Sequence, residues 1–187
     1  NMKTSSALGV LLLFCFFFFL VAQSRHPRQR TRNIAAQPSL VSPRSILEAE
    51  ANRDVKSKVL FNALKNPSVS VVKMAILALG RIGDPVALEP LSDLLNKKSK
   101  ELRIATAFSM GVIGGDLALK LLGQHAEMHK EGDVTGTILT ALGRAGNEST
   151  VVALSKFVQN AKDKDILYGA AQGLGILWSG DSAKWAV

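Results

Sequence analysis

The chain has 187 residues and a formal net charge of +8, a balance that would suit a nucleic-acid-binding protein. The excess charge lies before residue 45, where six basic and no acidic side chains occur, so residues 45–187 carry only +2. That part has six scattered aromatic residues and no basic stripe, which argues against a nucleic acid as the partner.

The first feature along the chain is an unbroken apolar run over residues 7–22, preceded by one charged side chain, Lys3. As a helix this run would rise about 24 Å, less than the roughly 30 Å hydrocarbon core of a membrane. We therefore expect residues 1–24 to be a signal peptide cleaved before Arg25, and the protein to be periplasmic or secreted. The alternative is an uncleaved membrane anchor over residues 7–22, because the arginines after the run tend to hold that flank in the cytoplasm.

Residues 25–44 are basic, contain three prolines and show no helical periodicity, so they are predicted to be a disordered linker. Order is expected to begin at Ser45, because Ser45 and Glu48 have the spacing of a helix capping box. The one cysteine, Cys15, lies in the apolar run. Disulfides, thiol catalysis and cysteine metal sites are therefore excluded from the rest of the chain.

Glycines then recur at a fixed period. Four of them stand 31, 32 and 32 residues apart, and each follows a small residue two positions earlier and a Leu or Met one position earlier. Another glycine lies three residues after each of the first three, whereas the fourth has Trp178 there. A fixed period of this length indicates a repeat protein. The seven repeat glycines are Gly80, Gly83, Gly111, Gly114, Gly143, Gly146 and Gly175.

Each repeat is predicted to contain two helices. In the unit 66–97, an Asn-Pro pair has the sequence of a helix start, and apolar residues follow on two sides of the helix. Such a helix must be sandwiched between neighbours. Gly83 can end it in the left-handed conformation, and Asp84-Pro85 starts a second helix. That second helix is predicted to face inward with four leucines: Leu88, Leu91, Leu94 and Leu95.

The same pattern predicts a partial unit before this one, two full units after it and an incomplete unit at the end: 45–65, 98–130, 131–162 and 163–187. In the incomplete unit the turn is expected to slide from Trp178 to Gly180. The unit would then stop midway through its second helix, so we expect the chain to be the amino-terminal part of a longer array. In every unit the first glycine is expected to let the paired helix approach closely, because it has no Cβ.

The motifs NPSV at 66–69, ALGRIGDP at 78–85, ELR at 101–103 and MGVIG at 110–114 resemble HEAT repeats of the short bacterial kind, often called lyase-like HEAT repeats. The resemblance extends over residues 45–187 and departs from the family pattern at Trp178. It implies an all-α solenoid of stacked helix pairs that serves as a protein–protein interaction scaffold.

The resemblance also leaves an enzyme open. Bacterial cyclophilin-type peptidyl-prolyl isomerases with HEAT arrays behind a signal peptide look similar to this start, and their catalytic domain would lie outside these 187 residues. Some bilin lyases use such repeats as well, although no residue of this chain supports that activity independently.

No catalytic constellation occurs in the sequence. Ser70 and Lys73 have SxxK spacing without the partner motifs of that enzyme class, and the glycines around Gly175 belong to the repeat. His125 and His129 are four residues apart and could share one helix face toward a metal ion. We favour a solvated helix end there, and we expect neither a catalytic residue nor a cofactor.

The predicted binding residues lie on the second helices, which would present polar side chains to a protein partner: Glu89, Asp93, Gln124 and Lys156. A further candidate is a set of lysines in the links between units, because equivalent loops of a solenoid stack into a column. These are Lys97, Lys98 and Lys100, with Lys130, Lys162 and Lys164. They form either a mildly basic edge that meets an acidic partner or ordinary solvated loops.

Overall fold

The computed structural model describes residues 41–185, with side chains up to residue 179. The predicted signal segment and the predicted linker as far as residue 40 lie outside the described residues. Within them the chain forms only helices and turns, which confirms the predicted all-α class. The elements are α2 (Pro43–Ala51), α3 (Lys58–Ala63), α4 (Val69–Ile82), η1 (Pro85–Ala87), α5 (Leu88–Ser92), η2 (Asp93–Asn96), α6 (Lys100–Ile113), α7 (Gly115–Met128), α8 (Gly132–Ala145), α9 (Glu148–Asn160) and α10 (Lys164–Trp185).

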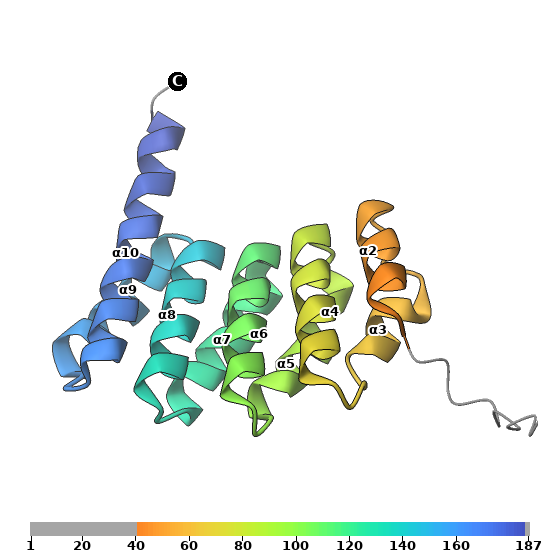
Figure 1. The fold of residues 1–187 in the computed structure, drawn as a ribbon. Coiled ribbons are helices and arrows are strands. Elements are labelled where there is room, and N and C mark those ends of the chain that lie inside the picture. The colour runs from red at the N-terminus through yellow and green to blue at the C-terminus, as the bar shows by residue number, and fades with distance from the viewer. Residues whose placement is uncertain (1–40, 186–187) are drawn as a thin grey trace, which may run out of the picture. The chain divides into compact units, whose positions relative to one another are not determined.

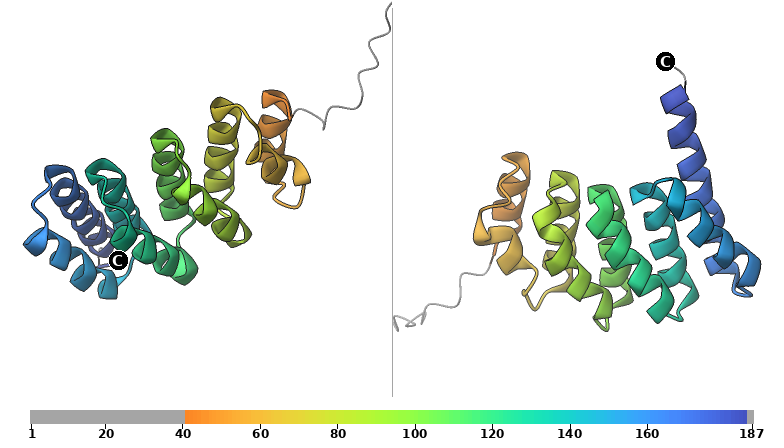
Figure 2. Two further views of the ribbon diagram at one scale, coloured as in Figure 1. Left: turned by 90° about the horizontal axis from the view of Figure 1, so that it is seen from below. Right: turned by 180° about the vertical axis from the view of Figure 1, so that it is seen from behind.

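The helices form two layers (Figures 1 and 2). The first layer contains α2, α4, α6, α8 and α10, which lie side by side, and each of them contacts the next. The second layer contains α3, α5, α7 and α9, which lie behind the first. Each unit from α2 to α9 is therefore a helix pair stacked on its neighbours, as a solenoid requires.

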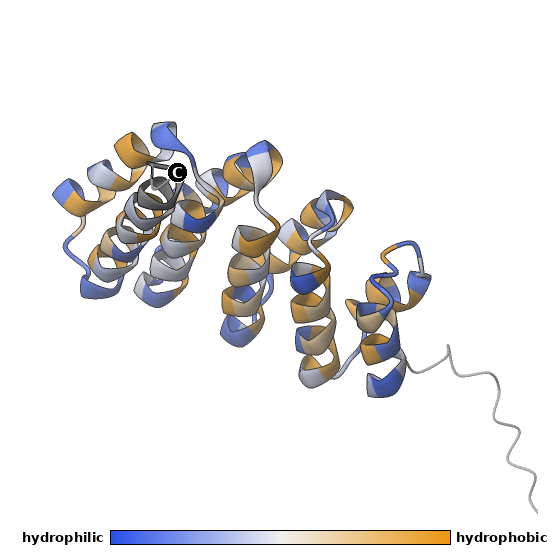
Figure 3. Ribbon diagram, turned by 90° about the horizontal axis from the view of Figure 1, so that it is seen from above, coloured by the Kyte–Doolittle hydropathy of each residue, from blue (hydrophilic) through white to orange (hydrophobic). Residues whose placement is uncertain are grey.

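The hydrophobic core continues through the units. The four leucines predicted to face inward from the second helix after Gly83 are all buried. Figure 3 shows hydrophobic residues at successive turns of helices in both layers, as expected of helices covered from more than one side. Within residues 41–185 no helix is long and apolar enough to cross a membrane, and the apolar run over residues 7–22 lies outside this range.

The turn between α4 and η1 forms as the sequence predicts. Gly83 has a left-handed φ of 76°, and its N–H donates to the carbonyl of Leu79 over 3.1 Å. The Asp84 carboxylate accepts from the N–H of Val86 over 2.9 Å, and Pro85 is the first residue of η1. The second helix of this unit is less regular than expected, because the two 3-10 turns η1 and η2 flank the short helix α5.

Two predicted helix starts are wrong. The helix α2 begins at Pro43, where Ser42 is the cap and its Oγ accepts from the N–H of Ser45 over 3.1 Å. A Ser followed by a Pro offers a cap and a fixed φ two residues earlier, so Ser45 lies inside the helix. At the second start, Asn66 does not cap α4. Its Oδ1 accepts from the N–H of Ser68 over 2.9 Å, which closes a turn. Ser68 is the cap instead, and the helix begins at Val69.

Three of the repeat glycines, Gly80, Gly111 and Gly143, pack against the next unit, which corrects the expectation that they face their own second helix. A Cβ on Gly80 would lie 2.7 Å from the Cβ of Ser109, and one on Gly111 would lie 2.8 Å from the Cβ of Ala141. The partner is in each case the small residue two positions before the next repeat glycine. The pairs are Gly80 with Ser109, Gly111 with Ala141 and Gly143 with Gly173. The periodic glycines and the small residues two positions before them are thus the two sides of one contact between neighbouring units.

The last described helix differs from the predicted incomplete unit. No turn forms at Gly180, and α10 continues from Lys164 to Trp185. The helices α4 and α6 end at glycines with φ of 76° and 70°. Trp178 stands at the equivalent position, and a side chain with a Cβ disfavours the positive φ of those two helix ends. The helix α8, by contrast, ends at Gly146 with a φ of −78°, which any residue adopts.

Candidate binding surface

Two adjacent hollows lie over the first layer between α4 and α10. One of about 600 Å³ lies over α4 and α6 and reaches α8, and the other, of about 380 Å³, lies over α6, α8 and α10. Phe108 and Thr137 line both hollows. The two hollows are therefore neighbours, and together we call them the first-helix groove, which crosses four successive units of the stack.

Equivalent positions of successive units build this groove. Leu77, Phe108, Thr140 and Gln172 each lie three residues before a repeat glycine, and each lines one of the two hollows. Because the first helices stack in register, these side chains follow one another across the layer. The row is apolar on α4 and α6 and polar on α8 and α10.

The apolar half of the groove contains Leu77, Ile104, Ala105 and Phe108. The Phe108 side chain is 45% exposed, which is high for an aromatic residue next to a core. The guanidinium carbon of Arg144 on α8 lies 4.8 Å from the centroid of the Phe108 ring, in a cation–π contact. Arg144 is exposed, and no carboxylate pairs with it among the residues that the structure describes.

The polar half of the groove is organised by Thr140. Its Oγ1 lies 3.0 Å from the carbonyl oxygen of Gly136 and 3.0 Å from Oε1 of Gln172 on α10. It also lies 3.3 Å from the carbonyl oxygen of Gly169. These contacts connect α8 to α10 and hold the Gln172 amide at the rim. Asp165 lines the same hollow and is exposed, so it adds a negative charge there.

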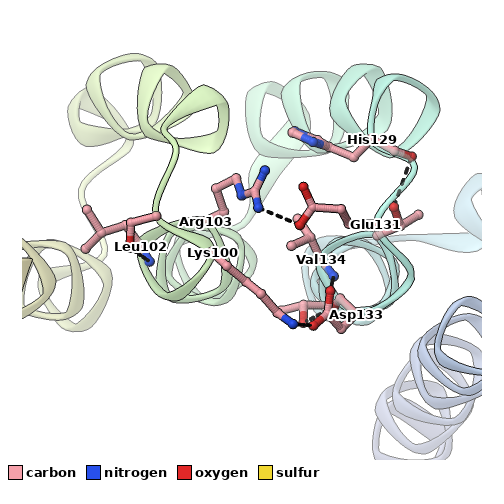
Figure 4. A network of polar contacts seen from close by, with 10 residues as sticks. Lys100, Leu102, Arg103, His129, Glu131, Asp133 and Val134 are labelled. Atoms are coloured by element: carbon pink, nitrogen blue, oxygen red, sulfur yellow. Dashed lines mark hydrogen bonds and ion pairs between the residues drawn. The ribbon is translucent and has the colours of Figure 1, made fainter.

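Ion pairs join α4 to α6 and α6 to the start of α8. Lys73 Nζ lies 2.5 Å from Oε1 of Glu101, across the mouth of the apolar half. Arg103 on α6 is only 12% exposed and its Nη2 lies 2.6 Å from Oε2 of Glu131, at the start of α8 (Figure 4). These contacts fix the spacing of the helices that form the groove floor.

Lys100 also forms an ion pair with the next first helix. It pairs with Asp133 on α8, and the hydrogen bond to that carboxylate raises the pKa of Lys100 and lowers the pKa of Asp133 (Figure 4). Lys100 thus faces an acid of the next unit and lines the groove, so it is not a free charge of a basic edge. The other lysines of the predicted edge are exposed: Lys97, Lys98, Lys130, Lys162 and Lys164.

The residues predicted to bind a partner from the second layer are all exposed: Glu89, Asp93, Gln124 and Lys156. They come from α5, η2, α7 and α9. None of them lines the first-helix groove. The groove lies on the opposite layer, and sequence reasoning missed it. The available signal was the fixed distance from the repeat glycines, because the position three residues earlier changes from Leu and Phe to Thr and Gln along the array.

The expectation that the two histidines lie at a solvated helix end is wrong. His125 is 7% exposed, and its Nε2 lies 3.2 Å from Oγ of Ser92 on α5. Its ring stacks on that of His129, with centroids 5.6 Å apart. The reason is that α7 contacts both α5 and α8, so the end of α7 is covered.

Burial lowers the pKa of both histidines. For His125 the neighbouring His129 lowers the pKa further, and for His129 the positive charge of Arg103 does so, while Glu131 raises it. The Nδ1 of His125 and the Nε2 of His129 have no hydrogen-bond partner in the described part of the chain. Within residues 41–185 no group of three or more His, Cys, Asp or Glu side chains could hold a metal ion, so the pair lacks the further ligands of a metal site there.

The stacked pairs and the groove across their first layer define an α-solenoid of helical repeats. The repeats can be assigned to a family, because residues 46–111, from α2 to near the end of α6, match the family profile of HEAT repeats. Residues 46–111 are therefore HEAT repeats. The periodic glycines continue beyond the matched stretch, at Gly143 and Gly175. No curated protein matches the chain.

Proposed function

We propose that this protein is an interaction scaffold that holds a segment of a partner protein in the first-helix groove. HEAT repeats in general mediate protein–protein interactions, which supports the class of function. The first-helix groove is the proposed place of binding, because its two hollows of about 600 and 380 Å³ share Phe108 and Thr137 and so offer an extended site.

The chemistry of the groove favours a particular kind of segment. An apolar side chain of the partner would bury against Leu77, Ile104 and the exposed face of Phe108, which are the kind of contacts that dominate binding energy. A carboxylate beside it would pair with Arg144, whose charge lies next to the same ring and has no acidic partner among the described residues. Hydrogen-bonding groups further along would meet Thr140 and Gln172.

Selection from a displayed peptide library tests this proposal. Peptides selected on the wild-type chain are expected to share an apolar anchor next to an acidic residue. Their affinity should fall at least about tenfold for Phe108→Asp, a loss typical of a central contact. The matched control is Val86→Asp, a change at a 57% exposed position of η1 outside the groove, which should leave affinity unchanged.

The opposite result identifies the other layer as the binding surface. If binding survives Phe108→Asp but is lost when Glu89, Asp93, Gln124 and Lys156 are replaced together by alanine, the partner binds the second helices. Loss of binding with Val86→Asp would contradict the groove as well.

We also propose that the protein acts outside the cytoplasm. The support is the apolar run over residues 7–22, which is too short for a membrane span. The run ends in the small residue Ala22, and Ser24 lies two positions later, as a cleavage site requires. A periplasmic or extracellular scaffold would meet exported partners.

A further inference from the structure

The outer face of α10 is the face that a further helix would cover if the stack continued. The face of α8 that contacts α10 includes Gly136, Thr140 and Gly143. One period of 32 residues later, the equivalent positions on α10 are Tyr168, Gln172 and Gly175. All three are exposed, and a Cβ on Gly175 would meet nothing within 4 Å.

Large aromatic side chains lie on this face. Tyr168 is 69% exposed and Trp178 is 82% exposed. With Ala171 and Gly175 between them they occupy positions i, i+3, i+7 and i+10, which form one stripe on a helix. We call this stripe the α10 face. Exposed aromatic residues flanking a stretch without bulky side chains are a feature of helix-packing surfaces, not of solvated ones.

The α10 face is symmetric about the level of Gly173. Ala171 and Gly175 lie two residues on either side of that level, and Tyr168 and Trp178 lie five residues on either side. At 100° per residue both pairs are centred on the same direction around the helix. A second α10 placed antiparallel across the first would therefore set Ala171 against Gly175 and Tyr168 against Trp178, twice over. Self-complementarity of this kind is what a two-fold interface requires.

We propose that the protein forms a two-fold dimer in which the α10 faces of two copies pack antiparallel. The contact continues the way in which first helices already pack within the chain, where a residue without Cβ meets a small residue of the next helix. The paired Tyr and Trp rings add the energy of aromatic contacts at both ends.

The symmetry of the α10 face favours a second copy as the occupant, because a two-fold axis places small residues against small residues and aromatic rings against aromatic rings. The other end of the stack is a poor match, because Leu47 on α2 occupies the position that is small in the other units. Head-to-tail stacking would place that leucine, rather than an alanine or serine, against Gly175.

Sedimentation equilibrium of the full chain tests the dimer. The wild-type chain is expected to dimerise with a Kd in the micromolar range, since one helix face buries less area than a standard interface. Trp178→Glu and Tyr168→Lys should each raise that Kd about 30-fold or more, as expected for aromatic anchors. Both side chains are largely exposed, so the variants should keep the wild-type circular dichroism spectrum.

The double variant Tyr168→Lys/Trp178→Glu is the sharpest test of the register. In the antiparallel dimer each new lysine faces the new glutamate of the other copy, so the double variant should dimerise more tightly than either single variant, and salt should weaken it. Acrylamide quenching of Trp178 fluorescence, measured with Trp185→Phe, should fall as the wild-type chain dimerises.

Leu47→Glu is the matched control, because it places a charge at a 54% exposed leucine on α2 and should leave the Kd unchanged. Dissociation by Leu47→Glu would mean head-to-tail stacking and would overturn the proposal. A wild-type chain that stays monomeric at its solubility limit would overturn it too, as would association that survives Trp178→Glu. A double variant no better than the single ones would rule out the antiparallel register.

Discussion

Gly111 on α6 packs directly against Ala141 on α8, and a Cβ on the glycine would lie 2.8 Å from the Cβ of the alanine. The two residues belong to different units and are the two sides of a contact that also occurs between Gly80 and Ser109. The contact sets how closely successive first helices approach, and therefore the width of the groove above them.

The first prediction concerns this contact. Gly111→Leu should destabilise the fold by about 1–3 kcal/mol, the usual cost of overpacking. The control is Gly123→Ala in α7, where a Cβ meets nothing within 4 Å, and which should stabilise by up to about 1 kcal/mol through helix propensity. Chemical unfolding measures both. Equal stability of Gly111→Leu and the wild type would mean that the units are stacked differently.

The second prediction concerns the turn at Gly83. Its φ of 76° is left-handed, so Gly83→Ala should cost about 1–2 kcal/mol although the added Cβ has free space. Gly83→Asn should cost less, because Asn tolerates this conformation better. Thermal unfolding of the two variants gives the comparison. An alanine variant as stable as the wild type would show that α4 ends in another way.

The third prediction concerns pH. The pKa of His125 and the pKa of His129 are both lowered in the folded state, mainly by burial. Below about pH 6.5 the unfolded chain binds protons at these residues before the folded chain does. Stability should therefore be full at neutral pH and fall as the pH drops through about 6.5 toward 5.

Urea unfolding between pH 7.5 and 5 measures this effect, and the double variant His125→Gln/His129→Gln is the control, with a shallower slope expected. Asp133 acts in a separate window. Because its pKa is lowered, its contribution is lost only below about pH 4. An unchanged slope in the double variant would mean that the two histidines are not the titrating groups.

The fourth prediction concerns the apolar run over residues 7–22. When the chain is expressed from Met2 in a host with a secretory pathway, the mature protein should begin at Arg25. Amino-terminal sequencing of the purified product decides the point. The control is Ala22→Arg, which removes a small residue from the cleavage site and should block processing. An intact amino terminus in the wild type would favour a membrane anchor.

Local sequence signals were sufficient to predict the repeat. The 31- and 32-residue spacing, the left-handed glycine at Gly83 and the inward leucines after it depend on residues close together in the chain, so they can be interpreted one unit at a time. Where a local signal had a competitor, the prediction failed. Ser42-Pro43 offered a better helix start than Ser45, and Trp178 removed the glycine that would have ended α10.

The stacking of units decided the rest. Whether Gly111 faces its own second helix or the next first helix, whether His125 is buried, and whether Lys100 is free depend on residues about 30 positions away that lie on another helix. The period by itself determined that the chain is a stack of helix pairs. Only the tertiary structure determined that the groove lies on the first layer, because packing between units selects which side of each helix remains open to a partner.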